Sequence, residues 1–407
     1  MLRRCSHGGR SARLRLGPGV AIAAVAVLAA ATPAQAPAFV YVTNAGDDTV
    51  SQYDVEGGGQ LAPLSPPTVP AVDIPFGVAV SPDGRNVYVA NLGAANAAHY
   101  VSQYDVGPGG GLEPKSPATV AAGGAPEHVA VTPDGRSVYA TNARDGTVSQ
   151  YNRLADGTLS PKHPATVAAG SEPIGLAVSP DGRSVYVTNF GPTGPGYVLQ
   201  YTVGPGGALS PKSPATVTAG FAPEGVAVSP DSRSAYVTNF LSGDISQYDV
   251  GPGGGLSPKT PATVATGSVS EAVAVSPDGR SAYATSLNGG VSQYDVGPGG
   301  GLSPKTPATV ATGVAPRGLA VSSDGQSVYV ANAASSSVSQ YGVGTGGRLS
   351  PRNPPTVAAG FGAFGVAVSP QPRLPTTEGQ CKHGGWKQFG FKNQGRCIRS
   401  VKRGSRN

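Results

Sequence analysis

One pattern of strand-like segments recurs seven times along the chain and limits its fold more than any other feature. Each copy holds a segment such as "VYVTN", a second such as "VSQYDV", a hairpin such as "GPGGGLSPK", a short "PATVAAG" and then "GVAVSPDGR". The segments are rich in β-branched and aromatic residues, and "SPDG" suits a type I turn. The tyrosine of the first segment stands at positions 41, 88, 139, 186, 236, 283 and 329.

Four strands in about 47 residues, repeated seven times, predict an all-β fold: a seven-bladed β-propeller of four-stranded blades over residues 39–373. The 60 glycines and 39 prolines agree with this prediction, because long helices tolerate neither residue well. The repeats begin with "FVYVTN" and end with "FGVAVSP". We therefore expect residues 364–369 to supply the innermost strand of the first blade and to close the ring.

The first 38 residues differ from the repeats. They combine five arginines with a short apolar run, Gly19 to Ala31, and with A-x-A pairs. This pattern predicts a secretory signal peptide over residues 1–38, so we expect a secreted protein, extracellular or associated with the cell wall. The apolar run is too short to span a bilayer, and nothing after Phe39 is long and apolar enough, so we expect no membrane span.

The last segment, residues 374–407, is basic and contains the two cysteines that remain once the signal peptide is removed. Cys381 and Cys397 form an even pair, and in an oxidising compartment we expect them to form a disulfide. The segment would then be a small disulfide-linked tail. It is either a stapled loop around its own aromatic residues or a cationic clip for anionic wall polymers.

The net charge of +6 belongs to the two ends of the chain. Residues 1–36 carry five arginines and no acid, and the tail carries eight Lys/Arg residues against Glu378. The repeats themselves are therefore net acidic. A propeller without a basic stripe is not expected to bind nucleic acid.

The "YVTN" and "SPDG" segments resemble the YVTN-repeat and lactonase-like seven-bladed propellers of secreted bacterial proteins. The resemblance covers residues 39–373. It implies the propeller fold and, as an activity, the opening of a lactone ring. Because families with different chemistry share such blade segments, the function has to be sought where the seven copies differ.

The copies differ most in the loops that enter the innermost strand and in those that join the second and third strands. In a propeller these two sets of loops share one face. We expect the first position of the innermost strand to surround the mouth of the channel, and there the seven copies carry unlike residues: Phe76, Glu127, Ile174, Glu224, Glu271, Arg317 and Phe364.

His128 also breaks the pattern, because five other copies have glycine at its position and the sixth has alanine. We expect Glu127 and His128 to face a pocket at the mouth, with His99, Arg144 and Asp145 as neighbours. The alternative is that these charges only stabilise the fold as ion pairs, Glu127 with Arg144 and Glu271 with Arg317.

Eight aromatic residues of the repeats that are not strand tyrosines map to the same face. Clustered on variable loops above a rigid scaffold, they favour a ligand-binding surface, although they could instead fill gaps between blades. They are Phe76, Tyr100, Phe190, Tyr197, Phe221, Phe240, Phe361 and Phe364.

Two functions fit these observations. The first is a binding or scaffolding module that holds a small molecule, a sugar or a cell-surface or wall component on the variable face. The alternative, implied by the resemblance, is a lactone hydrolase with His128 or His99 as general base, Glu127 orienting it and Arg317 polarising the carbonyl. A phosphorylated lactone fits poorly, because carboxylates outnumber cations at the mouth.

No cofactor is expected. The alternative is a calcium ion held by Glu127, Glu224 and Glu271, since carboxylate oxygens are the ligands that calcium prefers. We expect the protein to be a monomer.

Overall fold

The computed structural model describes residues 38–94, 98–191, 194–267, 269–288 and 290–370, and residues 382, 394–395 and 398–399 of the tail. The predicted signal peptide lies outside the described residues except for Ala38, which begins the first strand. The predicted disulfide between Cys381 and Cys397 also lies outside them.

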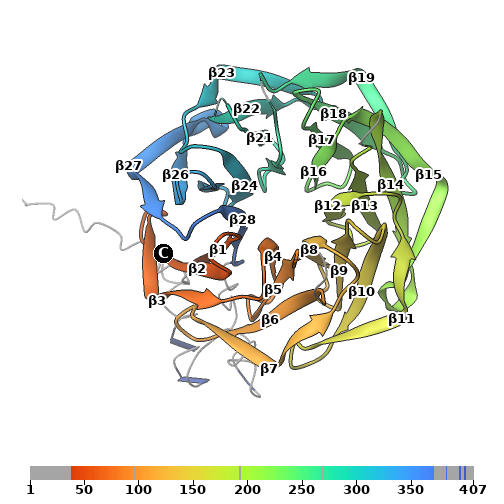
Figure 1. Cartoon of the computed structure of the whole chain (residues 1–407). Coiled ribbons are helices and arrows are strands. Elements are labelled where there is room, and N and C mark those ends of the chain that lie inside the picture. The colour runs from red at the N-terminus through yellow and green to blue at the C-terminus, as the bar shows by residue number, and fades with distance from the viewer. Residues whose placement is uncertain are drawn as a thin grey trace, which may run out of the picture. The chain divides into compact units, whose positions relative to one another are not determined.

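Within the described residues, 28 strands form seven antiparallel sheets of four strands, the blades, which are arranged around a central axis (Figure 1). From the innermost strand outward, the first three blades are β28 (Ala363–Val368), β1 (Ala38–Asn44), β2 (Thr49–Val55) and β3 (Leu61–Pro70); β4 (Pro75–Val80), β5 (Asn86–Asn91), β6 (Tyr100–Val106) and β7 (Leu112–Ala121); and β8 (Pro126–Val131), β9 (Ser137–Asn142), β10 (Thr147–Arg153) and β11 (Leu159–Ala168).

The remaining four blades follow the same order, with a 3-10 helix in two of the outer hairpins, η1 (Pro205–Gly207) and η2 (Thr345–Gly347). They are β12 (Pro173–Val178), β13 (Ser184–Asn189), β14 (Pro195–Val203) and β15 (Leu209–Phe221); β16 (Pro223–Val228), β17 (Ser234–Asn239), β18 (Asp244–Val250) and β19 (Leu256–Ala265); β20 (Val273–Val275), β21 (Ser281–Ser286), β22 (Gly290–Val296) and β23 (Leu302–Val310); and β24 (Pro316–Val321), β25 (Ser327–Asn332), β26 (Ser337–Val343) and β27 (Leu349–Ala358).

The two ends of the repeat region meet in the first blade. β28 pairs antiparallel with β1, with Val368 opposite Val40 and Val366 opposite Val42. The predicted closure of the ring by residues 364–369 is therefore confirmed, with the strand running over Ala363–Val368. This pairing gives the first blade its fourth strand and leaves no blade incomplete.

The residues that recur in all copies join neighbouring blades. The "VYVTN" tyrosine of each blade donates its hydroxyl hydrogen bond to a glycine carbonyl in the hairpin of the next blade, as Tyr41 does to Gly110 at 2.8 Å. The "SQY" tyrosine bonds a backbone carbonyl of the preceding blade, as Tyr53 does to Ala358 at 2.6 Å. Burial raises the pKa of Tyr53 to about 12, so these hydroxyls stay protonated donors.

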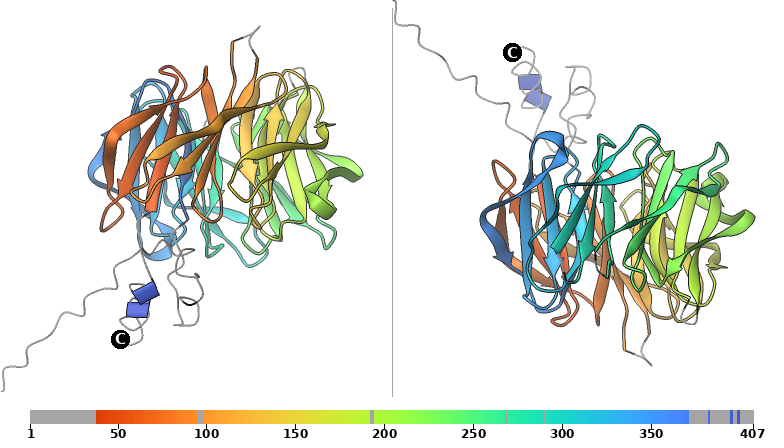
Figure 2. Two further views of the ribbon diagram at one scale, coloured as in Figure 1. Left: turned by 90° about the horizontal axis from the view of Figure 1, so that it is seen from below. Right: turned by 90° about the horizontal axis from the view of Figure 1, so that it is seen from above.

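The strands run along the channel, so the loops gather at its two ends (Figure 2). At one end, which we call the mouth, the loop into the innermost strand bonds the loop between the second and third strands, as in Ala143 N to Ala125 O at 2.9 Å. At the opposite end, the "SPDGR" turns lie beside the outer hairpins, with Val106 N bonded to Arg85 O at 2.8 Å. The predicted division of the loops between two faces is confirmed.

Candidate functional site

The mouth of the channel contains a cavity of about 480 Å³. All seven ring residues expected from the sequence line it; six are the second residue of their innermost strand, and Glu271 lies two residues before β20. These ring residues are Phe76, Glu127, Ile174, Glu224, Glu271, Arg317 and Phe364, and His128, Glu172 and Phe190 line the cavity beside them.

Close contact between neighbouring innermost strands holds the ring residues in place. A Cβ atom on Gly77 would lie 2.5 Å from the carbonyl oxygen of Glu127. A Cβ on Gly225 would lie 2.4 Å from that of Glu271. No side chain fits at such a distance, so a glycine after the ring residue lets the neighbouring strands approach closely. This close approach fixes the backbone position of the ring residue.

The threonine of "VYVTN" adds a hydrogen-bonded link at the same level. Thr188 Oγ1 accepts a hydrogen bond from Gly175 N at 2.8 Å and donates one to the carbonyl of Glu224 at 2.6 Å. The link therefore connects the innermost strands of two blades. Because Thr188 bonds only the backbone carbonyl of Glu224, the bond positions that residue without engaging its carboxyl group, and Glu224 lines the cavity.

His128 stands where most blades have the close-contact glycine, and its imidazole is buried between blades. Its amide donates to Thr141 Oγ1 at 3.0 Å, and its Nδ1 atom has no hydrogen-bond partner among the described residues. Burial lowers the pKa of His128 to about 4, and a hydrogen bond with the backbone of Ile174 opposes this only in part. The imidazole is therefore neutral near pH 7. Because a group with a pKa of about 4 is a weak base, the imidazole suits a hydrogen-bonding role better than that of a general base.

Two glutamates of the ring hold their protons far more tightly than usual. Burial, and then the charge of Glu172, raise the pKa of Glu127 to about 7. Burial, and then the charge of Glu127, raise the pKa of Glu224 to about 8, although the charge of Arg317 lowers it in part. Near neutral pH one carboxyl group can therefore be ionised while the other is protonated.

The other half of the ring forms a continuous set of contacts. Arg317 makes an ion pair with Glu271, which is 7% exposed. Its guanidinium carbon lies 5.7 Å from the ring centroid of Phe364, whose ring is 4.1 Å, centroid to centroid, from that of Phe76. The ion pair suggested as a purely structural alternative does form. Arg317 Nε nonetheless has no hydrogen-bond partner within the described residues, so the guanidinium retains an unused donor.

The expected neighbours of His128 lie elsewhere. His99 Nε2 is 2.8 Å from Arg144 Nη1. Asp145 accepts a hydrogen bond from Gly124 N at 2.6 Å. None of these three side chains lines the cavity. His128 therefore lines the cavity without the three neighbours that the sequence suggested for it.

Of the eight aromatic residues assigned to this face, three line the cavity and five do not. Phe76, Phe190 and Phe364 are the lining residues. Phe221 and Phe361 are 50% and 62% exposed at the surface. Tyr100, Tyr197 and Phe240 are half-buried outside the cavity.

Glu172 was missed by sequence reasoning although it faces the cavity. It precedes the proline that begins β12, two positions before the ring residue Ile174. A comparison of the copies at that position would have found it, because the others are all apolar or glycine: Ile74, Ala125, Ala222, Val269, Ala315 and Gly362.

Within the ranges that the structure describes, no group of three or more His, Cys, Asp or Glu side chains is arranged to hold a metal ion. Glu127, Glu224 and Glu271, the set considered for calcium, do not form such a group. In the same ranges, no helix is both long and apolar enough to cross a membrane.

Comparison with known proteins gives one family. The family model described as "Lactonase, 7-bladed beta-propeller" matches residues 75–193 and 176–359. No curated protein matches the sequence significantly.

Several solved structures have the same fold. A Bacteroides fragilis protein named as a candidate 6-phosphogluconolactonase is 18% identical, with a TM-score of 0.70 over 83% of this chain and 99% of that one. A periplasmic gluconolactonase of Pseudomonas aeruginosa is 22% identical, with a TM-score of 0.66 over 83% and 99%. A Lactobacillus plantarum protein is 21% identical, with a TM-score of 0.68 over 82% and 99%. At these identities the likeness shows the fold, and the chemistry has to be argued from the site.

Proposed function

This chain belongs to the lactonase family of seven-bladed β-propellers, and we propose that it hydrolyses an uncharged lactone in the cavity at the mouth. The observation that carries the proposal is the meeting of two carboxyl groups of raised pKa with a guanidinium in one cavity of about 480 Å³. Ring opening by water needs a base, an acid and a group that stabilises negative charge on oxygen.

The two carboxyl groups would divide the proton transfers. Glu127, with the lower pKa, takes a proton from water as the water oxygen attacks the carbonyl carbon. Glu224, with the higher pKa, gives its proton to the ring oxygen as the carbon–oxygen bond of the lactone breaks. The products are a hydroxyl group and a carboxylic acid, and proton exchange with solvent resets the pair.

Arg317 would bear the charge that develops on the carbonyl oxygen. Its ion pair with Glu271 and its contact with Phe364 fix the guanidinium plane, and the side chain, 31% exposed, lines the cavity. A donor oriented before the reaction stabilises the oxyanion without a cost of reorganisation.

The charge balance of the cavity favours a substrate without a phosphate. Four glutamates line it, Glu127, Glu172, Glu224 and Glu271, against one guanidinium, which already pairs with one of them. A phosphate would need several cationic or neutral donors and would meet carboxylates instead.

The test is a hydrolysis assay with glucono-1,5-lactone and 6-phosphogluconolactone, with the spontaneous rate subtracted. We expect turnover of the uncharged lactone only, and a fall in kcat/KM of about 10²–10⁴ in Glu127→Gln. Glu113→Gln, on the exposed face of β7, is the matched control and should behave as wild type. Turnover of neither of these lactones, nor of δ-valerolactone or its alkyl derivatives, above background would contradict the proposal and leave the binding or scaffolding function as the explanation of the cavity.

A further inference from the structure

The cavity continues below the ring residues into an apolar stretch of the channel. Two positions after every ring residue, the innermost strand carries Val or Leu, and six of these side chains line the cavity: Val78, Leu176, Val226, Val273, Leu319 and Val366. A strand rises about 3.3 Å per residue, so these side chains lie roughly 7 Å deeper than the ring. The cavity therefore has a polar rim and an apolar wall beneath it.

The stacked pair Phe76 and Phe364 links the rim to this wall. Both rings are half-buried at the mouth, 4.1 Å apart between centroids and tilted by 33°. A Cβ atom on Gly365 would come within 3.2 Å of Val78 Cγ1, so the valine lies against the strand that carries Phe364. Apolar surface thus runs from the rings into the channel along the two neighbouring blades that carry Phe364 and Phe76.

The volume of the cavity exceeds what a single small ring would need. At about 480 Å³ it lies within the range of pockets that enclose drug-sized ligands, roughly 300–1,000 Å³. A bare lactone ring held at the rim would leave the half-buried valines of the wall, Val78, Val226 and Val366, in contact with water. A ligand that also covers this wall binds more tightly, because the apolar surface that it covers leaves water.

We propose that the substrate is an uncharged lactone whose ring carries an aliphatic side chain. The chain lies along the wall formed by Val78, Val226 and Val366, and the lactone ring stays at the rim beside the carboxyl groups. This inference rests on the proposed function, because it names the substrate class of the same site.

The first experiment compares δ-valerolactone with the same ring carrying a methyl, propyl or pentyl group on the carbon next to the ring oxygen. We expect KM to fall about two- to fourfold for each methylene that leaves water, with kcat nearly constant. A KM that does not depend on chain length would overturn the proposal.

Substitutions in the apolar wall test whether the dependence of KM on chain length arises there. Val226→Thr and Val366→Thr replace a methyl group by a hydroxyl group of similar size and should flatten the dependence of KM on chain length. If one of them does not fold, Val78→Thr makes the same change at a third position. Val250→Thr, at a half-buried position of β18 outside the cavity, is the matched control and should keep the full dependence.

Non-hydrolysable lactams with the same side chains separate this inference from the proposed function. Titration calorimetry should show affinity that rises with chain length in the wild type and not in Val226→Thr. Rising affinity without hydrolysis of any lactone would leave the apolar site standing and contradict the hydrolase. Hydrolysis without any dependence on chain length would leave the hydrolase standing and contradict the apolar site.

Discussion

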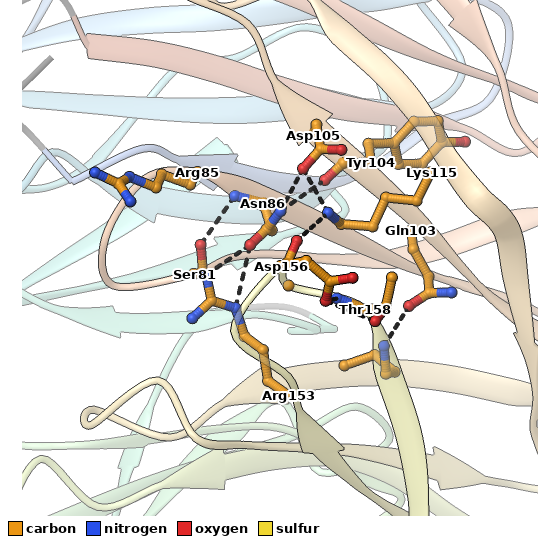
Figure 3. Close-up of polar contacts among 12 residues, drawn as sticks. Ser81, Arg85, Asn86, Gln103, Tyr104, Asp105, Lys115, Arg153, Asp156 and Thr158 are labelled. Carbon is orange, nitrogen blue, oxygen red and sulfur yellow. Dashed lines mark hydrogen bonds and ion pairs between the residues drawn. The ribbon is translucent and has the colours of Figure 1, made fainter. Parts of the chain in front are cut away.

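The two ends of the channel differ in how their charged side chains are paired. At the opposite end, charged side chains are paired and linked to the neighbouring blade: Lys115 pairs with Asp105 of its own blade and donates to the carbonyl of Asp156 in the next, and Arg153 donates to Asn86 Oδ1 of the preceding blade at 2.6 Å (Figure 3). At the mouth, the carboxyl groups of Glu127 and Glu224 accept no hydrogen bond from the described residues, and their pKa values are raised. Burial without compensation lowers stability, so the mouth is built for another purpose.

The pKa values express the same contrast. Burial alone would raise the pKa of Asp83 at the opposite end, but hydrogen bonds from Ser81 and Arg153 bring it below its usual value. Glu127 has no such hydrogen-bond donors, so burial leaves its pKa raised. Paired charge stabilises one end, whereas the mouth combines one ion pair, Arg317 with Glu271, with two titratable carboxyl groups of raised pKa, Glu127 and Glu224.

Two arginines, one at each end, test the contrast most strongly. Arg317→Met should lower kcat/KM by about 10²–10³, the usual loss for an oxyanion donor, and the double variant Arg317→Met/Glu271→Gln avoids leaving a buried carboxylate unpaired. Arg153→Met should instead lower the free energy of unfolding by about 1–3 kcal/mol and leave kcat/KM unchanged. Lactone kinetics and denaturant titrations measure both. Equal losses of activity in the two variants, after correction for the folded fraction, would remove the distinction between the ends.

The mouth should become more stable when its buried carboxyl group is neutralised. The folded-state pKa of Glu127 is about 7 against an ordinary value of 4.5, so its favourable contribution is complete below pH 4.5 and is lost as pH rises through 7. Glu127→Gln should therefore gain stability relative to wild type between pH 5 and pH 8, by about 2–3 kcal/mol. Denaturant titrations at the two pH values measure this gain. A difference independent of pH would mean that Glu127 is already paired.

The activity should have a narrow pH optimum between about 7 and about 8. Glu127 must be ionised to accept a proton and Glu224 protonated to donate one, so kcat/KM should fall about tenfold per pH unit on either side. The two limits belong to the interacting pair, and either substitution should change the whole profile. A flat profile between pH 6 and pH 9 would contradict these roles.

The smallest expected effect comes from Glu172. Its charge raises the pKa of Glu127, less than burial does, so Glu172→Gln should move the acid limb of the pH profile to lower pH with little change in the maximum. Glu113→Gln again serves as the control. A fall in the maximum by more than tenfold would show that Glu172 acts directly on the substrate.

Much of this protein could be predicted from its repeats. The number of blades, the four strands in each, the closure by the last strand and the membership of the ring all follow from aligning the copies. Alignment of the copies did not predict which side chains the ring residues contact. Alignment could not show that His128 is buried and neutral, that His99 and Arg144 lie outside the cavity, or that Glu172 faces it, because these depend on where loops of different length direct their side chains.

Some expectations concern residues that the structure does not describe. Export through a signal peptide and attachment through a disulfide-linked basic tail stay predictions from residues 1–37 and 374–407. A cell-wall binding assay of the full mature chain against a chain ending at residue 373, at low and at high salt, would test the tail.

By itself, the sequence determined the ring: regularly spaced tyrosines and glycines can satisfy their hydrogen bonds and close contacts only against identical neighbours, and seven such units have to close on themselves. Only the tertiary structure decided the chemistry of the mouth. Glu127, Glu224 and Arg317 come from three different blades, and the pKa of a buried carboxyl group depends on charges and water that only the folded channel brings near it or excludes.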